Sequence, residues 1–188
     1  MNDNREYRQN GEAISTNSRH ITGYGAVFDT PSTGLSWVET IAKGAITNDT
    51  IYNSDVFAKF NHDDNKILAR SKNGEGSLKL SVDDYGLKYE FDAPNTALGD
   101  ELLEYLRRGD ITASSFCFVI AEDGDRWYKE GSTIKRTITK IEKLMDIAPV
   151  FEPAYDSTMC VQRYNDIKSK SEEINKMLDE IKFQIELL

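Results

Sequence analysis

The stretch that most constrains the fold is 111–120, with the sequence ITASSFCFVI. It contains only β-branched, aromatic and small residues, and this composition predicts a strand buried on both faces. Because side chains alternate along a strand, Ser114 shares a face with large rings, whereas Ser115 lies between the small side chains of Ala113 and Cys117. Ser115 therefore has room beside it for a partner side chain or a substrate. The alternative is a core serine bonded to a carbonyl.

Alternating apolar and polar residues predict further strands on both sides of this stretch. They are 20–28, 56–62, 78–82, 87–91, 133–139 and 144–150. One clear internal helix is expected between Thr96, a favourable N-cap residue, and Gly109, which suits a helix C-terminus. This content predicts a mainly β fold with helices, arranged as a closed or nearly closed antiparallel β-barrel.

The two ends of the chain differ from this central part. Residues 1–17 are polar and are expected to be flexible, which leaves 18–163 as the β-barrel domain. In 164–188 the apolar residues follow a heptad-like spacing and predict a coiled-coil-type amphipathic helix for oligomerisation or docking. The alternative is a helix that packs on its own barrel. The apolar positions are Ile167, Ile174, Leu178, Ile181, Ile185 and Leu188.

Composition excludes several classes of protein. A formal net charge of -9 argues against nonspecific nucleic-acid binding, which needs clustered lysine and arginine. No apolar run is long enough to span a bilayer, and the polar N-terminus does not resemble a signal peptide. The two cysteines have no metal-ligand spacing, and no glycine-rich phosphate loop is present. We expect a reduced cytosolic protein without metal or cofactor.

A serine becomes a nucleophile only when a base takes its proton, and the chain has two histidines. His62 ends a predicted strand beside Asn61 and two aspartates, a position suited to a base at a barrel rim. His20 begins the first strand and is expected to be a solvated edge residue. Cys117 shares the face of Ser115 and is an alternative nucleophile, although a cysteine between aromatic residues is more typical of core packing.

Asp146 is the candidate for a third member of such a site. It lies in an otherwise apolar predicted strand, where a carboxylate costs free energy unless it has a hydrogen-bonding or charged partner. A carboxylate in that position could hold the tautomer of an imidazole and stabilise its positive form. The alternative is a salt bridge to Arg136 or Arg70.

With these residues in view, the sequence resembles the tailed-phage prohead maturation protease family, which is similar to the herpesvirus assembly proteases. The resemblance covers roughly 20–160 and consists of short motifs in family order. They are Gly25-Ala26-Val27-Phe28, ETIAKGA at 39–45, Asn61-His62-Asp63, Leu68-Ala69-Arg70, Tyr85-Gly86-Leu87, Arg107-Arg108-Gly109, ASSFCF at 113–118 and DIAPVFEPA at 146–154.

The resemblance implies a herpesvirus-protease-like barrel and a serine endopeptidase. It implies His62 as the base, Ser115 as the nucleophile and Asp146 as the third residue, with Arg70 a candidate oxyanion or substrate contact. Cys117 stands where the family usually has glycine, and Asp146 where glutamate is commoner. Ser114, beside Ser115, leaves a one-residue ambiguity.

The implied substrates are the capsid protein with its scaffolding segment and the protease itself, cut inside the assembling procapsid in the bacterial cytoplasm. The implied state is a homo-oligomer. A second hypothesis is a catalytically inactive scaffold or assembly module of the same fold, suggested by Cys117 and the heptad-like tail.

Overall fold

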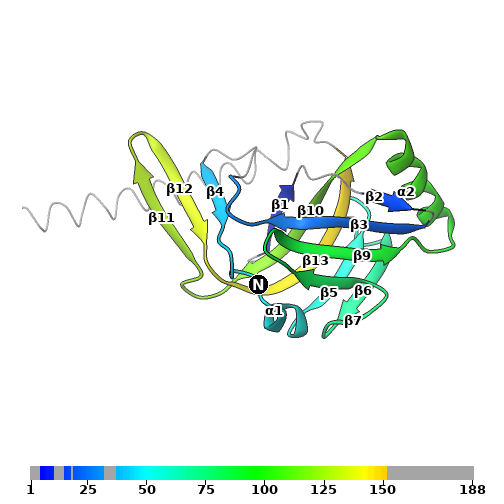
Figure 1. Cartoon of the computed structure of the whole chain (residues 1–188), viewed down its shortest axis with the longest axis horizontal. Helices are drawn as coiled ribbons and strands as arrows, with labels where there is room; N and C mark the ends of the chain where they lie inside the picture. Colours follow the sequence, from blue (N-terminus) through cyan, green and yellow to red (C-terminus); the bar gives the residue numbers. More distant parts are fainter. Residues whose placement is uncertain (1–4, 11–14, 18, 32–36, 152–188) are drawn as a thin grey trace, which may run out of the picture. The chain divides into compact units, whose positions relative to one another are not determined.

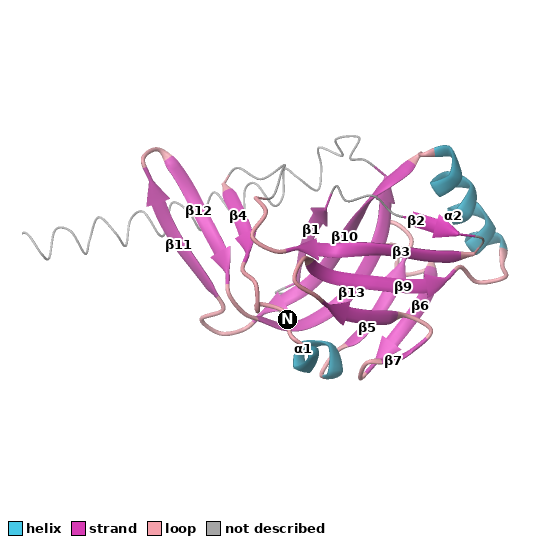
Figure 2. Ribbon diagram, in the orientation of Figure 1, coloured by secondary structure: helices cyan, strands magenta, loops and turns pink. Residues whose placement is uncertain are grey.

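The structure is a computed structural model that describes residues 5–10, 15–17, 19–31 and 37–151 (Figure 1). Strands dominate these residues, with two helices among them (Figure 2). The helices are α1, Asn48–Tyr52, and α2, Ala97–Arg108. Thr96 accepts a hydrogen bond from the Gly99 amide at the start of α2, and Gly109 ends the helix with a φ of 77°. The helix predicted between these two residues is therefore confirmed.

The largest sheet has six strands in the order β1-β10-β13-β5-β6-β7. Their bounds are β1 Arg5–Asn10, β5 Asp55–Lys59, β6 Ile67–Lys72, β7 Glu75–Gly76, β10 Ile111–Ile120 and β13 Ile141–Phe151. The predicted strand 111–120 is β10, the second strand of this sheet. Its neighbour β1 lies in the polar segment 1–17, where the sequence showed no strand pattern.

Two smaller sheets complete the described fold. A four-stranded sheet has the order β2-β3-β9-β8, and a three-stranded sheet has the order β11-β12-β4. The bounds are β2 Ser15–Asn17, β3 His20–Val27, β4 Val38–Ile41, β8 Lys79–Val82, β9 Gly86–Asp92, β11 Asp125–Glu130 and β12 Thr133–Ile138.

The expected closed or nearly closed antiparallel barrel is wrong. The described strands form three separate open sheets, and two pairings, β13 with β5 and β12 with β4, are parallel. Alternation along a sequence identifies strands but carries no information on their partners, which are set by contacts between distant segments. The fold class that also included a C-terminal coiled-coil-type helix is not the one observed. Residues 164–188, in which that helix was expected, lie outside the described residues. Among the described residues, α1 and α2 are the only helices.

The main core joins the six-stranded and four-stranded sheets. Phe116, Phe118 and Ile147 contribute from the first, and Ile21 and Tyr89 contribute from the second. The rings of Phe116 and Phe118 stack with their centroids 4.7 Å apart. This core fixes one face of β10 and β13 in the interior, so the side chains on the opposite face are available for the site.

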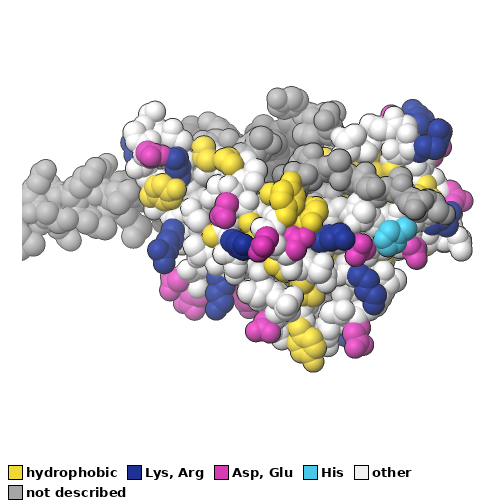
Figure 3. All heavy atoms as spheres, viewed as in Figure 1, with side chains coloured by type: hydrophobic (Ala, Val, Ile, Leu, Met, Phe, Trp, Pro, Cys, Tyr) yellow, Lys and Arg dark blue, Asp and Glu magenta, His cyan; other side chains and the backbone are white. Residues whose placement is uncertain are grey.

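The outer surface is mixed in charge. In the face shown in Figure 3, basic and acidic side chains are interspersed over the described part of the surface. Within the described residues, no helix has the length and apolar character that crossing a membrane requires.

Candidate active site

The order of strands brings three candidate residues together. Strand β13 lies between β10 and β5, so Asp146 on β13 is flanked by Ser115 on β10 and by the turn that follows β5. Cys117 pairs with Asp146 across β10 and β13, and Ser115 pairs with Ala148. Directly opposed residues in an antiparallel pair share a face, so Ser115 and Asp146 point to the same side of the sheet.

A bulge in β13 makes this arrangement compatible with the core. Cys117 pairs with Asp146 and Phe118 with Leu144, which leaves Met145 as an extra residue in β13. Leu144 and Ile147 both belong to the main core and are at most 1% exposed. Asp146 lies between them in sequence but points away from that core. Strict alternation would have put Leu144 and Asp146 on the same face.

His62 is positioned by a tight turn. Asn61 and His62 both have positive φ, 54° and 59°, and the Asp63 amide donates to the Phe60 carbonyl at 3.1 Å. Positive φ at both central residues is the pattern of a type I′ turn, and asparagine and histidine tolerate it better than most residues. The Asn61 amide also donates to the Pro149 carbonyl at 3.0 Å, which attaches the turn to β13.

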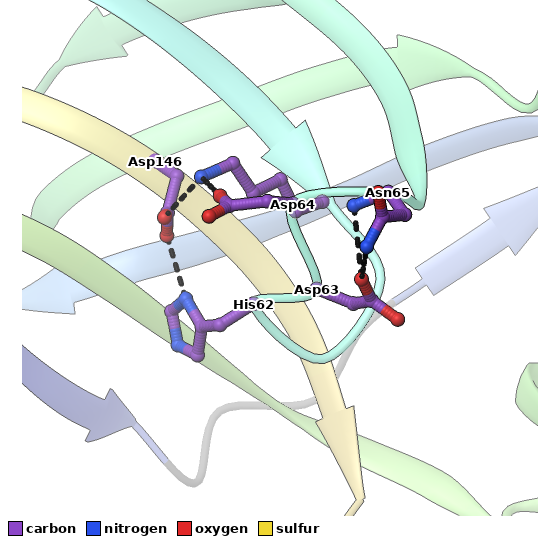
Figure 4. A network of polar contacts seen from close by, with 6 residues as sticks. His62, Asp63, Asp64, Asn65 and Asp146 are labelled. Atoms are coloured by element: carbon purple, nitrogen blue, oxygen red, sulfur yellow. Dashed lines mark hydrogen bonds and ion pairs between the residues drawn. The ribbon is translucent and has the colours of Figure 1, made fainter.

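The three side chains form a continuous hydrogen-bonded series. His62 Nε2 lies 2.7 Å from Ser115 Oγ, and His62 Nδ1 lies 2.6 Å from Asp146 Oδ1 (Figure 4 shows the second contact). An acidic partner at Nδ1 favours the tautomer with its proton there, so that Nε2 accepts the hydroxyl proton of Ser115. Ser115 is 5% exposed and Asp146 2%, whereas the His62 side chain keeps 20%.

The adjacent residues Ser114 and Ser115 of β10 point to opposite faces of the sheet and have different partners. Ser114 lies on the core face of β10, where its hydroxyl is 2.8 Å from that of Tyr89. Burial raises the pKa of Tyr89, and the hydrogen bond with Ser114 only partly opposes this effect. Ser114 is thus a core residue, and the structure brings Ser115 rather than Ser114 to His62.

Arg70, His20 and Cys117 are the other residues that the sequence singled out. The Arg70 guanidinium makes two hydrogen bonds to Asp55, of 2.7 and 2.5 Å, and its role as an oxyanion or substrate contact stays a prediction. His20 Nδ1 contacts Asp92 at 2.9 Å on the exposed surface. Cys117 is fully buried and not in a disulfide, and it faces the same side of β10 as Ser115, whose hydroxyl contacts the imidazole. Within the described residues, no group of three or more His, Cys, Asp or Glu side chains could hold a metal ion.

Sequence reasoning missed Lys59, the cation that contacts Asp146. Its Nζ lies 3.0 Å from Asp146 Oδ2 and 2.6 Å from Asp64 Oδ1. Arg136, one expected partner, instead contacts Glu39 at 3.0 Å and Asp125 at 2.7 Å. The available signal was a lysine between the apolar residues Ala58 and Phe60, three residues before His62.

A buried serine hydroxyl, an imidazole and a carboxylate in series are the groups that serine hydrolases use. The model of the Caudovirus prohead serine protease family matches residues 5–176, so the chain belongs to this family and is a serine protease. The predicted family resemblance is therefore confirmed.

Among solved structures, the bacteriophage T4 capsid assembly protease is similar in fold. The TM-score is 0.51 at 11% sequence identity, over 79% of this chain and 98% of that one. No curated protein matches the sequence. At 11% identity, the T4 structure supports the fold of this chain only. The roles of individual residues are argued from the distances within the site.

Proposed function

We propose that this chain is the endopeptidase of prohead maturation, which cuts the capsid protein with its scaffolding segment, and itself, inside the assembling procapsid. The observation that carries the proposal is the Ser115–His62–Asp146 series, with heavy-atom distances of 2.7 and 2.6 Å. Membership of the prohead serine protease family supports the same class of reaction and substrate.

In the proposed acylation step, Ser115 Oγ attacks the scissile carbonyl carbon while His62 Nε2 takes the hydroxyl proton. The resulting imidazolium gives this proton to the leaving amine nitrogen as the peptide C–N bond breaks, and an ester on Ser115 remains. Water then attacks the ester, His62 accepts a proton from the water, and the serine leaves with that proton. Asp146 holds Nδ1–H and stabilises the imidazolium in both steps.

Small side chains leave space at the reacting hydroxyl. Ala113, Ala148 and Val150 form a separate buried cluster on the same face as Ser115. Ala148 is directly opposite Ser115, where the two Cβ atoms of a pair lie about 4.5–5.5 Å apart. Side chains of this size leave room beside the Ser115 hydroxyl for the imidazole.

Co-expression with the capsid precursor of the same phage tests the proposal. Wild-type chain and the Ser114→Ala variant should process the precursor, whereas Ser115→Ala should leave it uncut, as measured by intact mass. Cleavage by Ser115→Ala that stops in Cys117→Ala would assign the nucleophile to the thiol.

The competing hypothesis of an inactive assembly module needs a measurement that does not depend on the substrate. A serine-directed fluorophosphonate should add one adduct to the wild type, and peptide mapping should place it on Ser115. An assembly module without catalysis would take no adduct and would leave the precursor uncut.

A further inference from the structure

We infer that Lys59 is a positioning residue of the site, which fixes the orientation of the Asp146 carboxylate toward His62. This inference rests on the proposed function, because it concerns the same series of side chains. It adds a fourth side chain to the three that the sequence pointed to.

Asp146 has two carboxylate oxygens, and different partners engage them. Oδ1 lies 2.6 Å from His62 Nδ1, and Oδ2 lies 3.0 Å from Lys59 Nζ. The carboxyl group is only 2% exposed, and an ionised carboxylate so far from water is costly without a charged or hydrogen-bonding partner. Lys59 provides that partner on the side of the carboxylate that His62 does not use.

Lys59 is itself held on both sides. Its side chain is 12% exposed, and its ammonium bridges Asp146 and Asp64. Asp64 is 80% exposed and therefore holds Lys59 from the solvent side. Lys59 and Asp64 flank the turn of His62 on either side, so one segment of β5 and its turn presents both the base and the cation.

The ammonium stays charged in this setting. Burial alone lowers the pKa of Lys59, but the hydrogen bonds that its ammonium donates to Asp64 and Asp146, together with their negative charges, outweigh burial and raise the pKa. The cation is therefore present at neutral pH. A carboxylate fixed at Oδ2 cannot rotate away from Nδ1, and this restriction keeps the tautomer that catalysis needs.

Removing the charge without the bulk tests this role. Lys59→Met should lower kcat by about 10- to 100-fold, less than the roughly 10⁴-fold that loss of the orienting carboxylate costs a serine protease. KM should change by less than about twofold, because Lys59 acts on the base rather than on bound substrate. Lys59→Arg keeps the charge and should recover most of the lost kcat.

Lys66 gives a matched control. It lies on the same turn, carries the same charge and places its Nζ 5.1 Å from the centroid of the Phe60 ring. Lys66→Met should leave kcat within about twofold of the wild type. Combination with Asp146→Asn separates positioning from general stability: if Lys59 acts through Asp146, Lys59→Met should cost little more in that background.

A proton spectrum separates this inference from the proposed function, since it needs no turnover. In Ser115→Ala protein, the His62 Nδ1–H bonded to Asp146 should give a far-downfield signal. Adding Lys59→Met should shift or remove this signal, whereas adding Lys66→Met should not. An unchanged signal together with an unchanged kcat in Lys59→Met would overturn the inference and leave the protease intact. Failure of the wild type to cleave, with the signal behaving as expected, would count against the proposed function alone.

Discussion

The backbone amide of Asn61 donates a 3.0 Å hydrogen bond to the carbonyl of Pro149, and this bond joins the turn of His62 to the strand of Asp146. Pro149 pairs with Ser114, the neighbour of Ser115. One main-chain contact therefore relates the segments of His62, Asp146 and Ser115, which lie on or directly after three different strands.

The first prediction concerns this turn. Asn61→Val places a β-branched residue at a φ of 54° and should cost about 1–2 kcal/mol of unfolding free energy. It should also lower kcat at least tenfold, because the turn positions His62. Asn61→Gly accepts the same φ and should keep kcat within about threefold. Chemical denaturation and peptide hydrolysis measure the two effects, and equal kcat in both variants would contradict this role of the turn.

The second prediction contrasts the adjacent serines. Ser114→Ala leaves the buried Tyr89 hydroxyl without this partner and should cost about 1–3 kcal/mol of stability while cleavage persists. Ser115→Ala should do the opposite, with cleavage lost and the free energy of unfolding changed by less than about 1 kcal/mol. Urea titration and a cleavage assay on the same preparations check both outcomes. Loss of cleavage in Ser114→Ala without loss of stability would reverse the assignment.

The third prediction is a dependence of stability on pH through Tyr89. Burial raises its pKa above the ordinary 10.0, so the folded state retains a proton that the unfolded chain releases. This contribution is complete below about pH 10 and falls as the pH rises further, by up to about 1.4 kcal/mol per pH unit. Tyr89→Phe should flatten the fall in unfolding free energy above pH 10. Tyr52→Phe, at a tyrosine that is 64% exposed, should leave it as in the wild type.

The fourth prediction concerns the acid. Asp146→Asn removes the negative charge that faces Nδ1 and should lower kcat by about 10²- to 10⁴-fold. Asp63→Asn is the control, because Asp63 bonds the Asn65 amide at 2.9 Å and asparagine can accept the same bond. Its kcat should stay within about twofold of the wild type. Steady-state kinetics on a capsid-derived peptide measure both, and comparable losses would argue against a special role for Asp146.

The sequence predicted those parts of the fold that local pattern determines. Apolar composition identified 111–120 with the bounds of β10, and residue types at both ends identified α2. The structure also brings together Ser115, His62 and Asp146, which were chosen for their chemistry and their resemblance to family motifs. Their catalytic roles remain the subject of the tests above.

The remaining features depend on contacts between distant segments. The parallel pairing of β13 with β5 leaves no trace in alternation, and the polar sequence of β1 does not indicate its place beside β10. Lys59 could not be assigned to Asp146 from the sequence, because 87 positions separate them and two arginines were equally plausible partners. The prediction of a closed barrel was wrong for the same reason, because closure depends on which strands pair with one another.

The extra residue Met145 makes this protease sensitive to changes in chain length. Deleting it would straighten β13 and force a choice between keeping Leu144 in the interior and keeping Asp146 beside His62. A chain with that deletion could assemble its sheets and remain inert, so insertions and deletions at this point would separate folding from enzymatic competence more sharply than most substitutions.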